Sequence, residues 1–152
     1  MTVLKPGASA LFLREAEVRR GLDLLFAGQA LLARAVDPLL DEAGLGRAHQ
    51  RALYFIARHP DLTVGELIAR LGITKQSLNR VLAELGAKAL VETRPGATDR
   101  RQKRLRLSPE GAALEARLFE AMRARLAAAY GHAGPDAVGG FWAVLEGLTA
   151  RG

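Results

Sequence analysis

Residues 62–107 contain two helix-start signals, and a short glycine turn lies just before the second. Thr63 is followed three residues later by Glu66, the spacing of a capping box. Thr74 offers a second N-cap just after Gly72. In the second helix, apolar residues recur at i, i+3, i+4 and i+7 and predict one buried face: Leu78, Val81, Leu82 and Leu85. The pattern predicts a helix-turn-helix.

The sequence period changes to two after the second helix. Residues 90–94 form a plausible strand, and in residues 103–107 Leu105 and Leu107 alternate with basic side chains. Residues 95–101 between them are rich in turn formers. We expect a two-stranded β-wing behind the helix-turn-helix.

Helical periodicity also covers both ends of the chain. A helix is expected from residue 11 to about 42, with Pro38 kinking or ending it near Val36, and a second from 47 to 58. Residues 1–10 look like a loose leader.

Two further helices should follow the wing. Ser108 and Pro109 start one that stops near Gly131, and Pro135 opens the last. The fold class is therefore mainly α with a small β-wing, in one domain over residues 1–152.

Positive charge is concentrated on the central module. From Arg70 to Arg106 there are ten Lys or Arg against three acidic residues, a net of +7. The whole chain carries +6, so everything outside that window sums to −1. A basic helix-turn-helix with a wing has the shape and charge to enter a nucleic-acid groove.

The outward side chains of the second helix suit base reading. Gln76 and Asn79 can pair bidentately with adenine, and Arg80 with guanine. Lys75 and Ser77 near the helix start suit phosphates. The alternative is an ordinary solvated helix face, which would not explain the capped neighbour and the basic wing.

The wing supplies a second candidate contact. Arg101 at its tip can enter a minor groove, and Asp99 could hold that guanidinium in a bidentate pair. Further basic side chains would approach phosphates: Arg100, Lys103, Arg104 and Arg106. A hairpin that only protects a sheet edge needs fewer charges. The complete predicted DNA-contacting set is Thr74, Lys75, Gln76, Ser77, Asn79, Arg80, Arg94, Asp99, Arg100, Arg101, Lys103 and Arg104.

Several function classes are disfavoured by composition. The chain has no cysteine, its three histidines show no ligand spacing, and neither a catalytic constellation nor a membrane-length apolar run occurs. We expect no enzyme activity, cofactor or metal, and a cytoplasmic location.

The terminal helices carry apolar stripes, including Phe141 and Trp142, that one small winged module cannot cover. Residues 11–42 and 109–150 are therefore expected to form a two-fold dimer, placing two recognition helices about 34 Å apart on a palindrome. Packing of these stripes within one chain is the alternative.

The arrangement resembles the MarR family of winged helix-turn-helix regulators. Asp99-Arg100-Arg101 and the segment Leu107–Gly111 are similar to the family's D-R-R … L-T-P-E-G signature, with Ser108 in place of Thr. The resemblance implies DNA contacts over residues 74–80 and at Asp99 and Arg101. It also implies a homodimer, often a repressor, whose DNA affinity a small ligand lowers.

A ligand pocket would lie among the first, second and fifth helices of this layout. Phe26, Arg51 and Tyr54 are candidates, although core packing explains Phe26 and Tyr54 at least as well. The function expected is a homodimeric, sequence-specific regulator on a palindromic DNA operator, with the DNA-binding region within residues 47–108. The alternative is an architectural protein, or a protein- or RNA-binding adaptor, without operator specificity.

Overall fold

The computed structural model describes residues 10–150, so residues 1–9 of the expected leader at 1–10 lie outside the described residues. The mainly helical fold with a small β-wing is confirmed. A short 3-10 helix, η1 (Leu11–Leu13), comes first. The helices are α1 (Glu15–Ala43), α2 (Arg47–Arg58), α3 (Val64–Leu71), α4 (Lys75–Ala87), α5 (Pro109–Ala133) and α6 (Pro135–Thr149). The strands are β1 (Leu62–Thr63), β2 (Val91–Pro95) and β3 (Lys103–Leu107).

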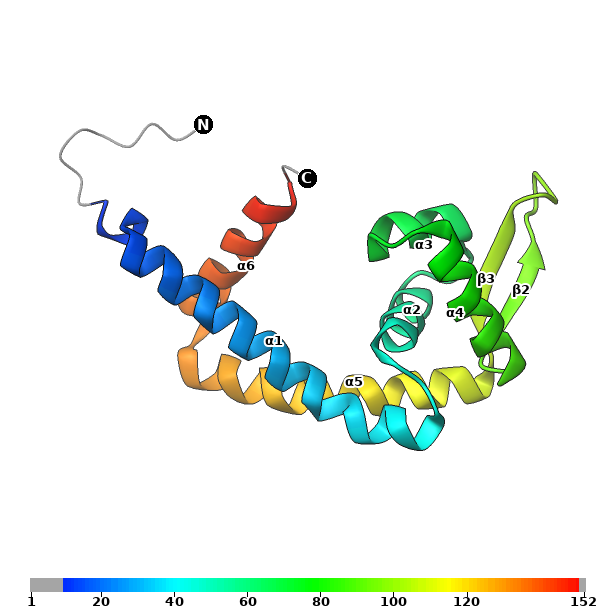
Figure 1. The fold of residues 1–152 in the computed structure, drawn as a ribbon, viewed down its shortest axis with the longest axis horizontal. Helices are drawn as coiled ribbons and strands as arrows, with labels where there is room; N and C mark the ends of the chain where they lie inside the picture. Colours follow the sequence, from blue (N-terminus) through cyan, green and yellow to red (C-terminus); the bar gives the residue numbers. More distant parts are fainter. Residues whose placement is uncertain (1–9, 151–152) are drawn as a thin grey trace.

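Two long helices form the frame of the molecule. α1 and α5 run beside each other, and α6 packs against α5 at the end away from the wing (Figure 1). The module of α2, α3, α4 and the sheet lies at the other end of this frame (Figure 1). The helix-turn-helix and wing are therefore held at one end of an elongated chain.

The predicted N-caps are present. The Oγ1 of Thr63 accepts from the Glu66 amide at 3.2 Å, and that of Thr74 accepts from the Ser77 amide at 3.1 Å. The return bond that would complete a capping box, from the Glu66 side chain to the Thr63 amide, is not formed among the described residues. Gly72, with φ of +63°, ends α3 and makes the turn into α4.

Of the two effects expected of Pro38, a kink or an end near Val36, the end does not occur, because α1 continues to Ala43. Pro38 cannot donate a backbone hydrogen bond, which weakens the helix locally. Val36 before it and Leu40 after it are each 1% exposed. Burial of both side chains against the module outweighs the lost bond, and Gly44 in the left-handed region ends the helix.

The sheet has one more strand than the sequence predicted. Its order is β1-β3-β2, with both pairs antiparallel and Leu62 opposite Leu105 in the β1–β3 pair. β1 is only two residues long, too short for an alternating pattern to reveal. β3 is therefore the central strand of the wing's base and not an edge strand.

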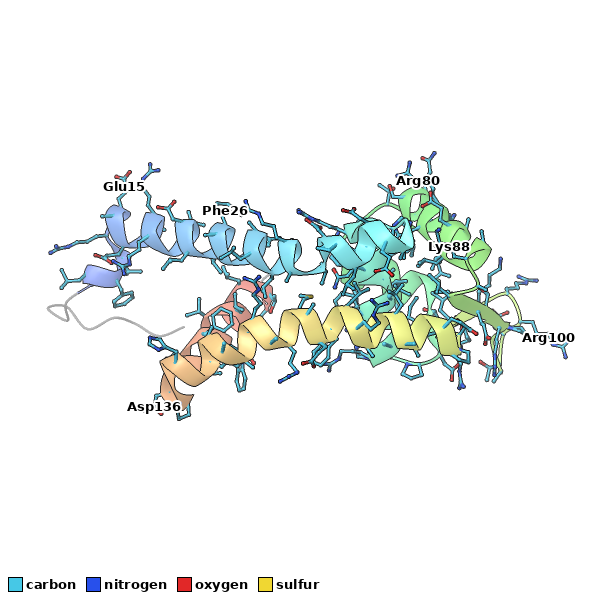
Figure 2. All side chains as sticks on the ribbon, turned by 90° about the horizontal axis from the view of Figure 1, so that it is seen from below. Glu15, Phe26, Arg80, Lys88, Arg100 and Asp136 are labelled. Carbon is cyan, nitrogen blue, oxygen red and sulfur yellow. The ribbon has the colours of Figure 1, made fainter. Side chains whose placement is uncertain are left out.

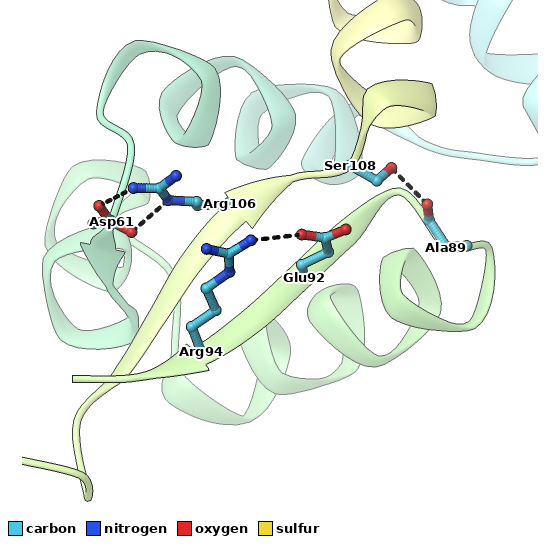
Figure 3. Close-up of polar contacts among 6 residues, drawn as sticks. All are labelled: Asp61, Ala89, Glu92, Arg94, Arg106 and Ser108. Carbon is cyan, nitrogen blue, oxygen red and sulfur yellow. Dashed lines mark hydrogen bonds and ion pairs between the residues drawn. The ribbon is translucent and has the colours of Figure 1, made fainter. Parts of the chain in front are cut away.

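The wing joins α5 through close backbone contacts. The Ser108 amide donates to the Leu90 carbonyl at 3.0 Å, and its hydroxyl donates to the Ala89 carbonyl at 2.6 Å (Figure 3). The Ser108 hydroxyl also accepts from the Gly111 amide at 3.0 Å, as an N-cap. A Cβ on Gly111 would lie 2.0 Å from the Leu90 carbonyl oxygen, so only glycine fits there.

The core lies inside the winged module and where the frame meets it. Its largest buried side chains come from every part of that end of the chain: Val36, Leu40, Leu53, Ile56, Leu67, Leu78, Leu85, Leu105 and Leu118. The described residues of α6 and of α1 before Ala30 include no buried side chain. One copy of the chain thus leaves the far end of the frame uncovered.

Candidate nucleic-acid interface

Helix α4 is fixed by one apolar face. Leu78, Val81 and Leu85 are buried in the core, which turns the opposite face to solvent. The predicted base-reading residues Gln76, Asn79 and Arg80 are all exposed. Burial of the apolar stripe therefore aims this polar set outward without any further contact.

The first turn of α4 favours an anion. It contains no acidic residue and begins with the exposed Lys75, although a cation at a helix N-terminus opposes the helix dipole. Thr74 and Ser77 bond to each other, with their hydroxyl oxygens 2.9 Å apart, and Ser77 is half-buried. Lys75 and the helix end thus form the stronger phosphate candidate, and Ser77 helps to cap the helix.

The wing tip corrects one predicted pair. Asp99 accepts a bond from the backbone amide of Arg101 through Oδ1 at 2.9 Å, and no ion pair joins the two side chains in the described chain. The Gln102 amide donates to the Asp99 carbonyl at 3.1 Å, closing the turn. Because the Asp99 carboxylate is engaged by the backbone, the exposed Arg101 guanidinium is left for an external anion.

The outer face of the sheet carries charges that are largely engaged. Arg94 lies 3.7 Å from Glu92 (Figure 3), and the half-buried Arg104 donates to the Asp61 carbonyl at 3.1 Å. Arg106 donates from Nε and Nη2 to the two carboxylate oxygens of Asp61, at 2.6 and 2.5 Å. Two members of the predicted DNA-contacting set, Arg94 and Arg104, therefore have intramolecular partners.

No sequence pattern indicated a role for Asp61. Hydrogen bonds from Arg106 hold the pKa of its carboxyl below the usual range, and they raise the pKa of Arg106. Its partners are 43 and 45 residues away along the chain, so no local pattern could indicate them.

The remaining predicted cations make no ion pair within the described chain: Lys75, Arg80, Arg100, Arg101 and Lys103. Arg80 and Arg100 lie at the same end of the molecule, opposite Glu15 and Asp136 (Figure 2). α4 and the wing tip thus present exposed cations at the same end of the molecule, and α4 contacts β2 of the wing.

A second feature is an apolar cavity of about 310 Å³ beside α5. It is lined by Leu32 of α1, Tyr54 of α2 and α5 side chains including Phe119 and Tyr130. Tyr54 therefore lies where a ligand pocket was expected. The other two candidates, Phe26 and Arg51, are exposed and do not line it.

Comparison with known proteins agrees with this geometry. A sequence model of the MarR family matches residues 43–102, which include the helix-turn-helix and most of the wing. The HTH-type transcriptional regulator PetP of Rhodobacter capsulatus is 48% identical over 142 residues, covering 93% of this chain and 86% of its relative. The chain belongs to the MarR family. This MarR-family protein is accordingly a DNA-binding transcriptional regulator, and its relatives are regulators, not enzymes, as the sequence predicted.

Solved MarR-family structures share the fold. A regulator from Silicibacter pomeroyi matches with a TM-score of 0.73 at 26% identity, covering 84% of this chain and 86% of that one. A mutant form of MarR from E. coli, solved in complex with operator DNA, matches with a TM-score of 0.66 at 22% identity, covering 92% and 99%. Within residues 10–150, no helix is long and apolar enough to span a membrane.

Proposed function

We propose that this MarR-family regulator binds a palindromic operator as a homodimer. The α4 helix of each copy enters a major groove, and Arg101 of each wing enters the flanking minor groove. The observation that carries the proposal is that α4 and the wing tip lie at the same end of the molecule (Figure 2). At that end of the molecule Gln76, Asn79 and Arg80 of α4 and Arg101 of the wing tip are all exposed.

Exposed apolar surface supports the dimer. Fourteen large apolar side chains of the described chain are exposed, and all lie outside the winged module of residues 47–108. They are Leu11, Phe12, Leu13, Val18, Leu22, Leu24, Leu25, Phe26, Leu31, Phe119, Phe141, Trp142, Val144 and Leu148. A surface this apolar is typical of an interface. A second copy would cover it and set the two α4 helices about 34 Å apart, one turn of DNA.

We further infer that the dimer is a repressor released by a small apolar effector. The cavity supports this part, because it touches both the frame and Tyr54 of the winged module. Arg123 in its lining is already bound by both carboxylate oxygens of Glu120, at 2.6 and 2.7 Å. That pairing favours a neutral molecule over a carboxylate.

Selection of DNA by the purified protein tests the function. A pool of random duplexes is captured, amplified and sequenced, in parallel for the wild type and for Gln76→Ala/Arg80→Ala. We expect the wild type to enrich a palindrome with half-sites about one turn apart, and the double variant to lose that enrichment. Salt-sensitive binding with no enriched sequence would instead support the architectural or adaptor alternative.

A further inference from the structure

Asp61 uses all its polar groups to hold the central strand of the sheet. Its amide donates to the Leu105 carbonyl at 3.1 Å, and its carbonyl accepts from Arg104. Its carboxylate accepts two bonds from Arg106 (Figure 3). A single residue between α2 and β1 is thus bound to three consecutive residues of β3.

The backbone of Asp61 supports the same interpretation. Its φ of +67° lies in the left-handed region, which side-chain-bearing residues adopt only at some energetic expense. Such a conformation persists when the surroundings determine it. Here the four bonds to β3 do so, because they extend the two-residue pairing of β1 with β3 by one further position.

This contact lies at the base of the wing, so a small rotation there displaces the wing tip. Arg104 is three residues from Arg101, and a strand advances about 3.3 Å per residue, so the tip lies roughly 10 Å beyond the contact. A rotation of the hairpin by about 15° would move the tip by nearly 3 Å, about the length of a hydrogen bond. The tip therefore needs a firm base if it is to meet a groove in register with α4.

We propose that Asp61, through its bonds to Arg104 and Arg106, is a positioning residue that sets the wing's angle to α4 and thereby the discrimination between operator and other DNA. The inference rests on the proposed function. Asp61 itself touches no DNA, and as an acidic residue it would repel phosphates. Its value lies in fixing Arg101, the tip residue, relative to Arg80 on α4.

Two variants and one control separate positioning from charge. Asp61→Asn removes a negative charge and weakens the two hydrogen bonds with Arg106. Arg106→Lys keeps the charge but cannot form two parallel bonds. Glu42→Gln breaks another exposed ion pair, with Arg117 of α5, outside the winged module, and changes net charge by the same amount as Asp61→Asn.

The measurement is the dissociation constant for a scrambled duplex divided by that for the palindrome of equal length most enriched by the wild type. We expect this ratio to fall about tenfold in both Asp61→Asn and Arg106→Lys, the loss of roughly one groove contact per complex, and to stay unchanged in Glu42→Gln. Amide exchange of residues 96–102 in the free protein should accelerate in the first two variants only, while thermal denaturation shows all variants folded.

The alternatives give different results. If Asp61→Asn strengthens binding to both duplexes alike and Arg106→Lys changes neither, Asp61 acts through charge alone and the proposal is wrong. Unchanged wing exchange in both variants would overturn it without any reference to DNA. A wild type that does not discriminate between the duplexes would refute the proposed function first, and the positioning role with it.

Discussion

The close approach of α5 to the wing makes Gly111→Ala a demanding test of the fold. The added Cβ would lie 2.0 Å from the Leu90 carbonyl oxygen and 2.9 Å from its carbonyl carbon. These are backbone atoms, so no side-chain rotation can relieve the overlap. The bond from the Ser108 amide to that same oxygen would have to break or stretch.

The magnitude follows from three contributions. Overpacking against a rigid neighbour costs about 3 kcal/mol, at the upper end of its usual range. Loss of the Ser108 bond adds about 1 kcal/mol. The better helix propensity of alanine returns about 1 kcal/mol. We therefore expect Gly111→Ala to lower the free energy of unfolding by about 3 kcal/mol.

Urea denaturation at one fixed protein concentration measures this change, because a dimer's stability depends on concentration. The matched control is Gly86→Ala, within α4 and clear of any atom within 4 Å of the added Cβ. That substitution should be neutral or stabilise by up to about 1 kcal/mol. If the two variants had similar stabilities, the proposed junction of wing and α5 would be wrong.

Four further predictions concern the interface and the charged groups. Arg101→Ala should weaken operator binding and reduce the slope of log affinity against log salt by about one, whereas Arg125→Ala on α5 should change neither; equal slopes in all three proteins would remove the wing tip from the interface. Leu22→Glu/Phe26→Glu, which places two charges on one face of α1, should give a folded monomer by sedimentation with greatly reduced operator affinity, and a persistent dimer would refute the assigned interface. The pKa of Asp61 is lowered in the folded protein, so its pair with Arg106 stabilises the fold above the ordinary carboxyl pKa. That stabilisation is lost as the pH falls through the lower pKa of the folded state. The stability difference between wild type and Asp61→Asn should therefore shrink over that acidic range. Burial raises the pKa of Glu115, so its effect on stability has the opposite sign. Glu115→Gln should be more stable than wild type near neutral pH, and the difference should vanish as the pH falls below the ordinary carboxyl pKa. A difference in stability that stays constant with pH would show that Glu115 does not titrate in this way.

Local signals in the sequence were enough for the helices of the module. Thr63, Thr74 and Ser108 each begin a helix as their positions predicted, and each side chain accepts the expected amide. Capping works within one turn of chain, so neighbouring residues carry the whole signal. The outward face of α4 was predictable for the same reason.

Long-range contacts were not predictable in this way. The bonds of Asp61 cross 43 and 45 residues, and β1 exists only because β3 lies beside it. Pro38 does not end its helix because burial of the residues on either side outweighs its local effect. Asp99 was predicted to pair with the guanidinium of Arg101, whereas a short carboxylate in a turn more easily reaches a backbone amide two residues on.

Groove insertion by a dimer can be tested most directly with a hydroxyl-radical footprint of the wild-type protein on its selected duplex. Two α4 helices and two wing tips predict protected stretches related by two-fold symmetry on one face of the DNA, with centres about one turn apart and a protected minor groove at each outer flank. A single asymmetric footprint, or uniform weak protection along the duplex, would contradict the dimeric operator complex.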